Sequence, residues 1–384
     1  MKMGESTIAY LKARKSKLKS KDFIVSLLID EIYTKKGTEY THGKFFGGEN
    51  GTLAKTLLCL MIKSVAGKYR DVISMYPVNN LTAAKQYAMW WSAVKNLTEI
   101  GFDTVVTMTD GNEVKAKCFK DYICNGTMQL WVDNPFAPGK RIFLMFDPTH
   151  LFKNFYNNFL KKEDFSFPSF EDECKIFRAS VDHVKELYEL EFGKPIKMAY
   201  KLSDQVLNPS TIEKTNVRLA DSFFHESTIN ALQYHSKNGH EDFAETAELL
   251  EIFRKWFNAV NVKSLFGAQR TRDKGRSAIK KEDRVILTYF EKFTKWLDNW
   301  EASGGSGLSR QTFNVARQTT KVFVLLANYL LDEKRSGLSS SWTYTLRLSR
   351  VALWLVAAIV WRKLLCAYFE CSSIGEDHPY TLAS

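Results

Sequence analysis

Residues 23–31 read FIVSLLIDE, a run of mostly apolar residues that ends in two adjacent acids, Asp30 and Glu31. The apolar part has the length and composition of a buried β-strand. Carboxylates at the end of such a strand cost free energy unless positive charge compensates them. This stretch therefore predicts a strand that delivers an acid to a site holding a cation.

Similar apolar runs recur up to residue 147, and two of them also end in an acid, Asp110 and Asp147. Amphipathic helix patterns fall between and after these runs, and glycines within residues 39–51 are typical of a hairpin. Alternating strands and helices predict an α/β layer. The predicted strands are residues 56–64, 71–78, 102–110 and 141–147, and the predicted helices are residues 82–100 and 150–162.

The three strand-end acids suggest a metal site, because sheet proteins place their chemistry at the carboxyl edge of their strands. Asp30 and Asp110 would hold Mg²⁺ or Mn²⁺, hard ions that prefer oxygen ligands. Two such ions assist phosphoryl transfer, and a third acid usually comes from a later helix. The alternative is that these acids cap turns, since TDGN at residues 109–112 is also good turn chemistry.

From about residue 165 the sequence is predominantly helical. Asn208, followed by Pro209, predicts a helix start at that point. Aromatic stripes within residues 247–260 and 284–300 indicate packing faces rather than base-stacking platforms. The basic stretch at residues 269–281 suits either a DNA backbone contact or an exposed loop.

The net charge of +11 and the pI near 9.1 favour a polyanionic partner. Nucleic acid is the first candidate and an anionic membrane surface the second, although many basic proteins bind neither. Six Lys and Arg residues at positions 12–21 suggest a nuclear-localisation or phosphate-binding arm, or a flexible leader. The six cysteines show no CxxC or zinc-finger spacing, and the apolar run at residues 351–361 is too short to span a bilayer.

Taken together, four motifs resemble the P-element transposase family, which includes the THAP-domain-containing transposase homologues of animals. The resemblance covers roughly residues 22–335, and its most specific pieces are DPTHLFKN and LNPSTIEKTNV. In chain order, the motifs are LLIDEIYTKKG, TDGNEVKAKCF, FDPTHLFKNFYNNFL and LSDQVLNPSTIEKTNVRLA.

The resemblance implies an RNase H-like catalytic core interrupted by a mostly α-helical insertion that binds GTP. It implies Mg²⁺-dependent (or Mn²⁺-dependent) excision and strand transfer of transposon DNA, with transposon ends and target DNA as partners. It also implies a homo-oligomer in the nucleus. The shortness of the apolar runs predicts no membrane association. Asp30 matches the first catalytic acid and Asp110 the second, both as metal ligands. Asp147 and His150 are accessory candidates: His150 contacts the active site or DNA, or is a structural cap.

The expected domains are a basic arm, the RNase H-like core, the insertion, a return helix of the core, and a divergent tail. Residues 208–216 belong to the insertion, although the sequence does not assign individual contacts to GTP. The boundaries are 1–22, 23–162, 163–300, 301–335 and 336–384, respectively.

The sequence departs from the family pattern at both ends. No C-x(2–4)-C of a THAP zinc module precedes residue 22, and residues 336–369 contain no acid where a D-x-x-E segment is expected. We interpret this second departure as a frameshifted or decayed end, with real divergence of the sequence as the alternative. Glu370, Glu376 and Asp377 lack the surrounding motif, and Glu31 is expected on the opposite strand face from Asp30. A non-catalytic, transposase-derived DNA-binding or interaction protein therefore stays open, as does an unrelated basic helical scaffold.

Overall fold

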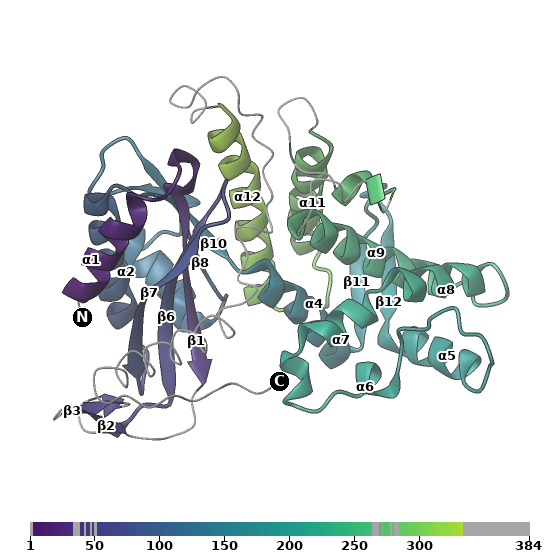
Figure 1. Cartoon of the computed structure of the whole chain (residues 1–384). Coiled ribbons are helices and arrows are strands. Elements are labelled where there is room, and N and C mark those ends of the chain that lie inside the picture. Colours follow the sequence, from purple (N-terminus) through teal and green to yellow (C-terminus); the bar gives the residue numbers. More distant parts are fainter. Residues whose placement is uncertain are drawn as a thin grey trace.

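The computed structural model describes residues 3–33, 39–41, 44–46, 48–49, 52–262, 269–270, 272–276, 279 and 284–332. Figure 1 shows a sheet flanked by helices on one side of the molecule and a mostly helical part on the other. The long helix α12 (Arg310–Asp332) lies between them.

The central sheet has six strands in the order β7-β6-β1-β8-β10-β9. β1 pairs in parallel with β8, and β8 with β10, whereas the pairs involving β6, β7 and β9 are antiparallel. All the strands predicted from the apolar runs are present, and β9 is an addition. The bounds are β1 (Ile24–Tyr33), β6 (Thr56–Ser64), β7 (Arg70–Val78), β8 (Asp103–Thr109), β9 (Trp131–Asp133) and β10 (Arg141–Phe146).

The glycine-containing stretch near residues 39–51 forms two short antiparallel pairs, in agreement with the predicted hairpin. They are β2 (Glu39–Thr41) with β3 (Lys44–Phe46), and β4 (Gly48–Glu49) with β5 (Thr52–Leu53).

Helix α2 (Ala83–Ile100) packs against the sheet, and its buried Trp90 donates a hydrogen bond of 2.9 Å to Thr107 of β8. The basic N-terminal stretch is not a flexible leader over its whole length. Residues of α1 (Glu5–Lys15) form a helix that lies against α2, and Leu11 is fully buried. The remaining elements of this part are η1 (Ser20–Asp22), α3 (Glu113–Lys117), the π-helical turn η2 (Cys118–Ile123) and α4 (Pro148–Lys162).

The second part is helical except for one hairpin, β11 (Asp164–Pro168) with β12 (Ile176–Ser180), which the sequence did not predict. Asn208 does not start a helix. It caps the C-terminal end of α6, and the next α-helix, α7, begins after Asn216, whose side chain accepts from the Arg218 N–H. The helices are α5 (Val181–Glu191), α6 (Asp204–Leu207), η3 (Glu213–Thr215), α7 (Val217–Phe223), α8 (Glu226–Ser236), α9 (Phe243–Val260), η4 (Lys274–Arg276) and α11 (Val285–Ala302).

The aromatic stripes of α9 and α11 are packing faces, as predicted. Phe152 and Phe155 of α4 stack on Phe257 and Phe253 of α9, with ring centroids 3.9 and 4.2 Å apart. Trp300 of α11 is fully buried and donates to the Ser166 carbonyl of β11. These contacts join the helical part into a core continuous with that of the sheet.

Helix α12 returns to the sheet after the helical part. Gln318 donates to the Leu144 carbonyl of β10 at 3.1 Å, and Thr319 to the Phe146 carbonyl at 3.4 Å. In the described part of the chain, no helix combines the length and apolarity that crossing a membrane would require. The position expected for a third acid, the apolar run at residues 351–361 and part of the basic stretch at 269–281 lie outside the described residues.

Candidate active site

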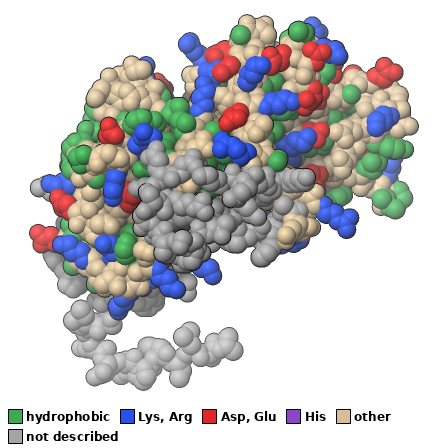
Figure 2. Space-filling view, turned by 90° about the horizontal axis from the view of Figure 1, so that it is seen from above, with side chains coloured by type: hydrophobic (Ala, Val, Ile, Leu, Met, Phe, Trp, Pro, Cys, Tyr) green, Lys and Arg blue, Asp and Glu red, His purple; other side chains and the backbone are tan. Residues whose placement is uncertain are grey.

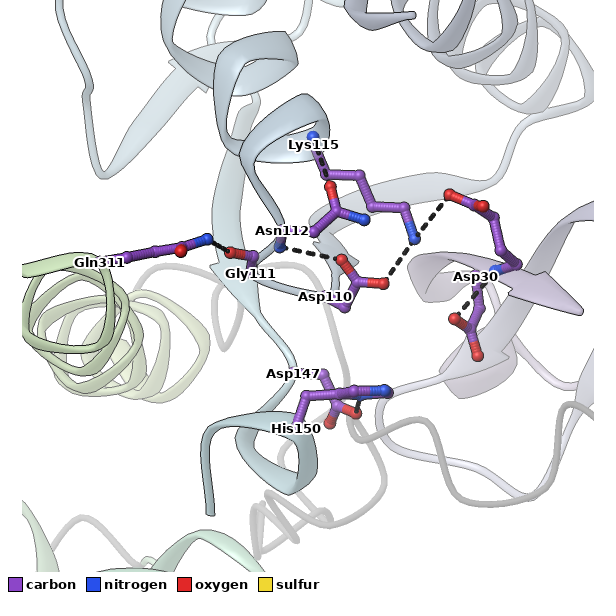
Figure 3. Close-up of polar contacts among 9 residues, drawn as sticks. Asp30, Asp110, Gly111, Asn112, Lys115, Asp147, His150 and Gln311 are labelled. Carbon is purple, nitrogen blue, oxygen red and sulfur yellow. Dashed lines mark hydrogen bonds and ion pairs between the residues drawn. The ribbon is translucent and has the colours of Figure 1, made fainter. Parts of the chain in front are cut away.

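Asp30 lies inside β1 rather than at its end, because the strand continues to Tyr33. The parallel pairing of β1 with β8 stops at Ile29, which lies opposite Thr109. The antiparallel pairing of β1 with β6 continues to Tyr33. Asp30 is therefore the first residue of β1 beyond the parallel pair, and Asp110 is the first residue beyond β8. The strand register thus brings the two predicted acids to the same edge of the sheet (Figure 3).

Asp110 combines the two roles that the sequence left open. Its Oδ1 accepts a hydrogen bond of 3.0 Å from the Asn112 N–H, which is turn chemistry, and Asn112 then caps α3. Its Oδ2 accepts from Nζ of Lys115 at 2.6 Å. The turn therefore orients the carboxylate through Oδ1 and leaves Oδ2 to pair with the ammonium of Lys115.

Lys115 is the residue of this site that the sequence did not reveal. Its side chain is completely buried, and its Nζ also lies 3.4 Å from Oε1 of Glu31. Glu31 is thus no bystander on the other face, since it shares a lysine with Asp110. The local signal was the spacing: five residues after Asp110, one turn into a capped helix, a lysine can fold back onto the acid.

Asp147 caps the N-terminal end of α4. Its Oδ1 accepts from the Thr149 N–H at 3.0 Å, and its Oδ2 lies 2.6 Å from Nδ1 of His150. Its own N–H donates to the Thr109 carbonyl at 2.8 Å, which ties the ends of β8 and β10 together. The side chain of Asp147 is buried, so it acts here as a helix cap that orients His150.

Burial and neighbouring charges shift the pKa of Asp30 and of Lys115. Burial raises the pKa of Asp30, and the charges of Asp110 and Asp147 raise it further, against the opposing influence of Lys115 and His150. For Lys115, burial lowers the pKa, but the neighbouring carboxylates, Asp110 foremost, outweigh burial and raise it. The lysine is therefore charged at neutral pH.

Burial also lowers the pKa of His150, but its hydrogen bond to Asp147 outweighs burial and raises the pKa overall. Lys153, one turn further along α4, has a pKa lowered by burial despite the nearby acids. Both side chains thus lie within electrostatic reach of Asp30 at the same acidic edge.

The donor chemistry suits a hard divalent cation. Asp30 and Asp110 offer carboxylate oxygens from adjacent strands, and the ammonium of Lys115 already stands at this place as a cation. Within the described ranges, no group of three His, Cys, Asp or Glu side chains is arranged to hold a metal ion together. The described residues thus supply two candidate ligands here, Asp30 and Asp110, while Asp147 serves as the N-cap of α4.

A groove of about 870 Å³ opens beside the site, between α3–η2 and α12. The residues that line it include Phe146, directly before Asp147. Arg317 and Lys321 pair with acids of α11, whereas Lys117, Lys120 and Arg310 are exposed and form no ion pair within the described part of the chain. On the face shown in Figure 2, Lys and Arg side chains are spread among Asp and Glu rather than gathered into one patch.

Two family models match the chain: the TNP-like RNase H N-terminal domain at residues 3–122 and the TNP-like GTP-binding insertion domain at residues 149–273. No curated protein matches the sequence significantly.

A solved structure described as the Drosophila P element transposase strand transfer complex is similar in fold, with a TM-score of 0.73. The similarity covers 96% of this chain and 76% of the other, at 14% identity, so it shows a shared fold. The RNase H-like core and the helical insertion expected from the sequence are thereby confirmed. The fold and the two matched domains together show that this chain belongs to the P-element transposase-like proteins.

Proposed function

We propose that this protein is a P-element-type DNA transposase that cleaves and rejoins DNA at the edge of its sheet where Asp30 and Asp110 meet. The observation that carries the proposal is the placement of these two acids, each the first residue beyond the pairing of two adjacent parallel strands, with the buried Lys115 paired to Asp110. Negative charge concentrated at a rigid sheet edge is what divalent-metal phosphoryl transfer requires.

Asp30 and Asp110 would hold Mg²⁺ or Mn²⁺. When bound there, the ion would activate the attacking oxygen and stabilise the leaving oxygen of a DNA phosphate. The raised pKa of Asp30 supports this role, because a carboxylate whose charge is costly gains from a cation. Asp147 would keep His150 oriented toward the same edge.

The groove beside the site would carry DNA. Lys117, Lys120 and Arg310 line it and could neutralise backbone phosphates, and its lining residue Phe146 directly precedes Asp147 of the acidic edge. A strand lying there would reach the acids with its phosphate groups, and its binding would weaken as salt increases.

GTP would bind to the insertion, which matches the GTP-binding insertion domain over residues 149–273. Binding of labelled GTP to the purified chain, with ATP as the competitor control, tests this part. Saturable binding that excess GTP abolishes and excess ATP leaves intact is expected. The absence of saturable binding would remove GTP from the proposal.

A non-catalytic, DNA-binding descendant of a transposase is the second candidate. Two observations favour it: residues 336–369 contain no acid, and Lys115 already neutralises Asp110. Both candidates share the groove, so DNA binding alone does not separate them.

Nicking of supercoiled plasmid in Mn²⁺ separates the two candidates. The active transposase nicks the plasmid, D30N and D110N abolish nicking, and D133N, which alters an exposed acid at the end of β9 outside the groove lining, retains it. A wild-type chain that binds DNA without nicking it supports the non-catalytic candidate. Nicking that survives both D30N and D110N would show that this site is not the source of the activity.

A further inference from the structure

The side chain of Lys115 is fully buried although it is charged, which is rare for a lysine and costly without partners. It lies on α3, a helix of five residues, and Lys117 on the same helix is exposed. Burial of Lys115 is therefore not a consequence of burying the whole helix. Its interactions have to account for it.

Those interactions join two strands. Nζ of Lys115 lies 2.6 Å from Oδ2 of Asp110, which follows β8, and 3.4 Å from Oε1 of Glu31, which belongs to β1 (Figure 3). The short contact to Asp110 is a charge-assisted hydrogen bond. The ammonium thus bridges the two strands that carry the proposed metal ligands.

The ammonium of Lys115 pairs with the oxygen of Asp110 to which a metal ion would bind. Oδ1 of Asp110 accepts from the Asn112 N–H, so Oδ2 is the oxygen left to face the site, and Lys115 occupies it. An ammonium and a divalent cation repel each other strongly at such a separation. A metal ion bound at Oδ2 therefore competes with the ammonium for the negative charge of Asp110.

We propose that Lys115 is an internal counter-cation that competes with a divalent metal ion for Asp110 and thereby sets the metal affinity of the site. This inference rests on the proposed function, because it takes Asp30 and Asp110 as the metal ligands. When Asp110 binds the metal ion, the ammonium of Lys115 stays paired with Glu31. The chain keeps its acidic edge neutralised in the metal-free state, at the expense of metal affinity.

The competing explanation is that Lys115 only fastens α3 to the sheet. A purely structural ion pair would affect the stability of the protein but not its affinity for metal once folded. The two explanations therefore differ in the metal-binding constant.

Mn²⁺ titration by calorimetry on the folded full chain distinguishes them. K115M removes the competing charge at similar size, and K117M is the matched control with the same change in net charge on the same helix. We expect K115M to bind Mn²⁺ about tenfold tighter or more, as the loss of one charge-assisted hydrogen bond implies, and K117M to bind like the wild type. Affinity of K115M equal to or weaker than that of the wild type overturns the inference while leaving the metal site in place. Absence of Mn²⁺ binding in every variant overturns the metal site itself and the inference with it.

A second measurement remains informative if K115M folds poorly. K115Q keeps a hydrogen-bond donor without the charge and is expected to bind Mn²⁺ more tightly than the wild type in the same titration. In chelator, D110N and K115Q are expected to be coupled, so that the double variant loses less stability than the two single losses added. Strict additivity would show that the pair seen at 2.6 Å does not act as a unit and would overturn the proposal.

Discussion

Nε2 of Gln311 donates a hydrogen bond of 2.6 Å to the carbonyl oxygen of Gly111, 200 residues earlier in the chain (Figure 3). Gly111 directly follows Asp110, and Gln311 lies in the first turn of α12. The helix that returns from the insertion therefore fixes the turn that carries the second acid. The acidic edge depends on both parts of the molecule being folded.

Gly111 also packs closely against α12, and this close packing makes the position sensitive to substitution. A Cβ at this position would lie 2.8 Å from Cγ2 of Val315 and 3.1 Å from its Cγ1. We expect G111A to lower the free energy of unfolding by about 1–3 kcal/mol through overpacking. Urea denaturation measures this loss.

Shortening Val315 supplies the control for that prediction. V315A removes both clashing methyl groups, so G111A should cost much less in the V315A background than in the wild type. An equal cost in both backgrounds would assign the effect of G111A to the backbone instead of to Val315.

Two glycines in the loop between α11 and α12 provide a matched pair. Gly304 (φ +67°) has open space around its Cβ position, whereas a Cβ on Gly307 (φ +130°) would collide with the ring of Phe165. G304A is expected to cost about 1–2 kcal/mol for its left-handed backbone. G307A should cost at least about 1–3 kcal/mol more, because the ring of Phe165 must also move. Thermal and urea unfolding of the two variants test the order, and equal losses would contradict the steric argument.

Asp30 is predicted to reduce stability at neutral pH in metal-free protein. Its folded-state pKa is raised, chiefly by burial, so the folded state binds the proton more tightly than the unfolded state does. Its favourable contribution is complete below the ordinary pKa of about 3.9 and is lost as pH rises through the folded pKa. D30N should therefore be more stable than the wild type at pH 7 in chelator, with a difference that shrinks toward pH 4.

D121N is the control for that experiment, since Asp121 is exposed and the change in charge is the same. Its stability should stay within about 0.5 kcal/mol of the wild type at both pH values. A D30N variant less stable than the wild type at pH 7 would show that Asp30 is stabilised by its cations instead of destabilised by burial.

The groove beside the site predicts a salt signature for DNA binding. K120A, which removes an exposed groove lysine, should lower the slope of log K against log salt by about one phosphate contact. K237A, an exposed lysine at the end of α8, should leave the slope unchanged. Fluorescence anisotropy with a DNA duplex from about 50 to 200 mM salt, a range in which phosphate contacts dominate, provides the measurement. An unaltered slope for K120A would show that the DNA does not contact Lys120 in this groove.

Much of the architecture was predictable from local patterns. The runs around Ile29, Met108 and Leu144 are apolar and have the length of a strand. Their alternation with the helical pattern near Trp90 predicted an α/β layer, and the structure has one. Exceptions occurred where local signals compete. Asn208 and Pro209 carry a helix-start signal, but the helix begins at Val217, because Asn216 caps it instead.

The sequence by itself determined which acids arrive at the edge of the sheet, because strand length and the position of Asp30 and Asp110 relative to apolar runs are local properties. Only the tertiary structure decided what those acids meet there. The ion pairs of Lys115 with Asp110 and Glu31 require β1 and β8 to be neighbours in one register, and the hydrogen bond from Gln311 requires α12 to return across the insertion. Such contacts depend on distances in space between residues remote in sequence, and hydrophobic periodicity does not encode them.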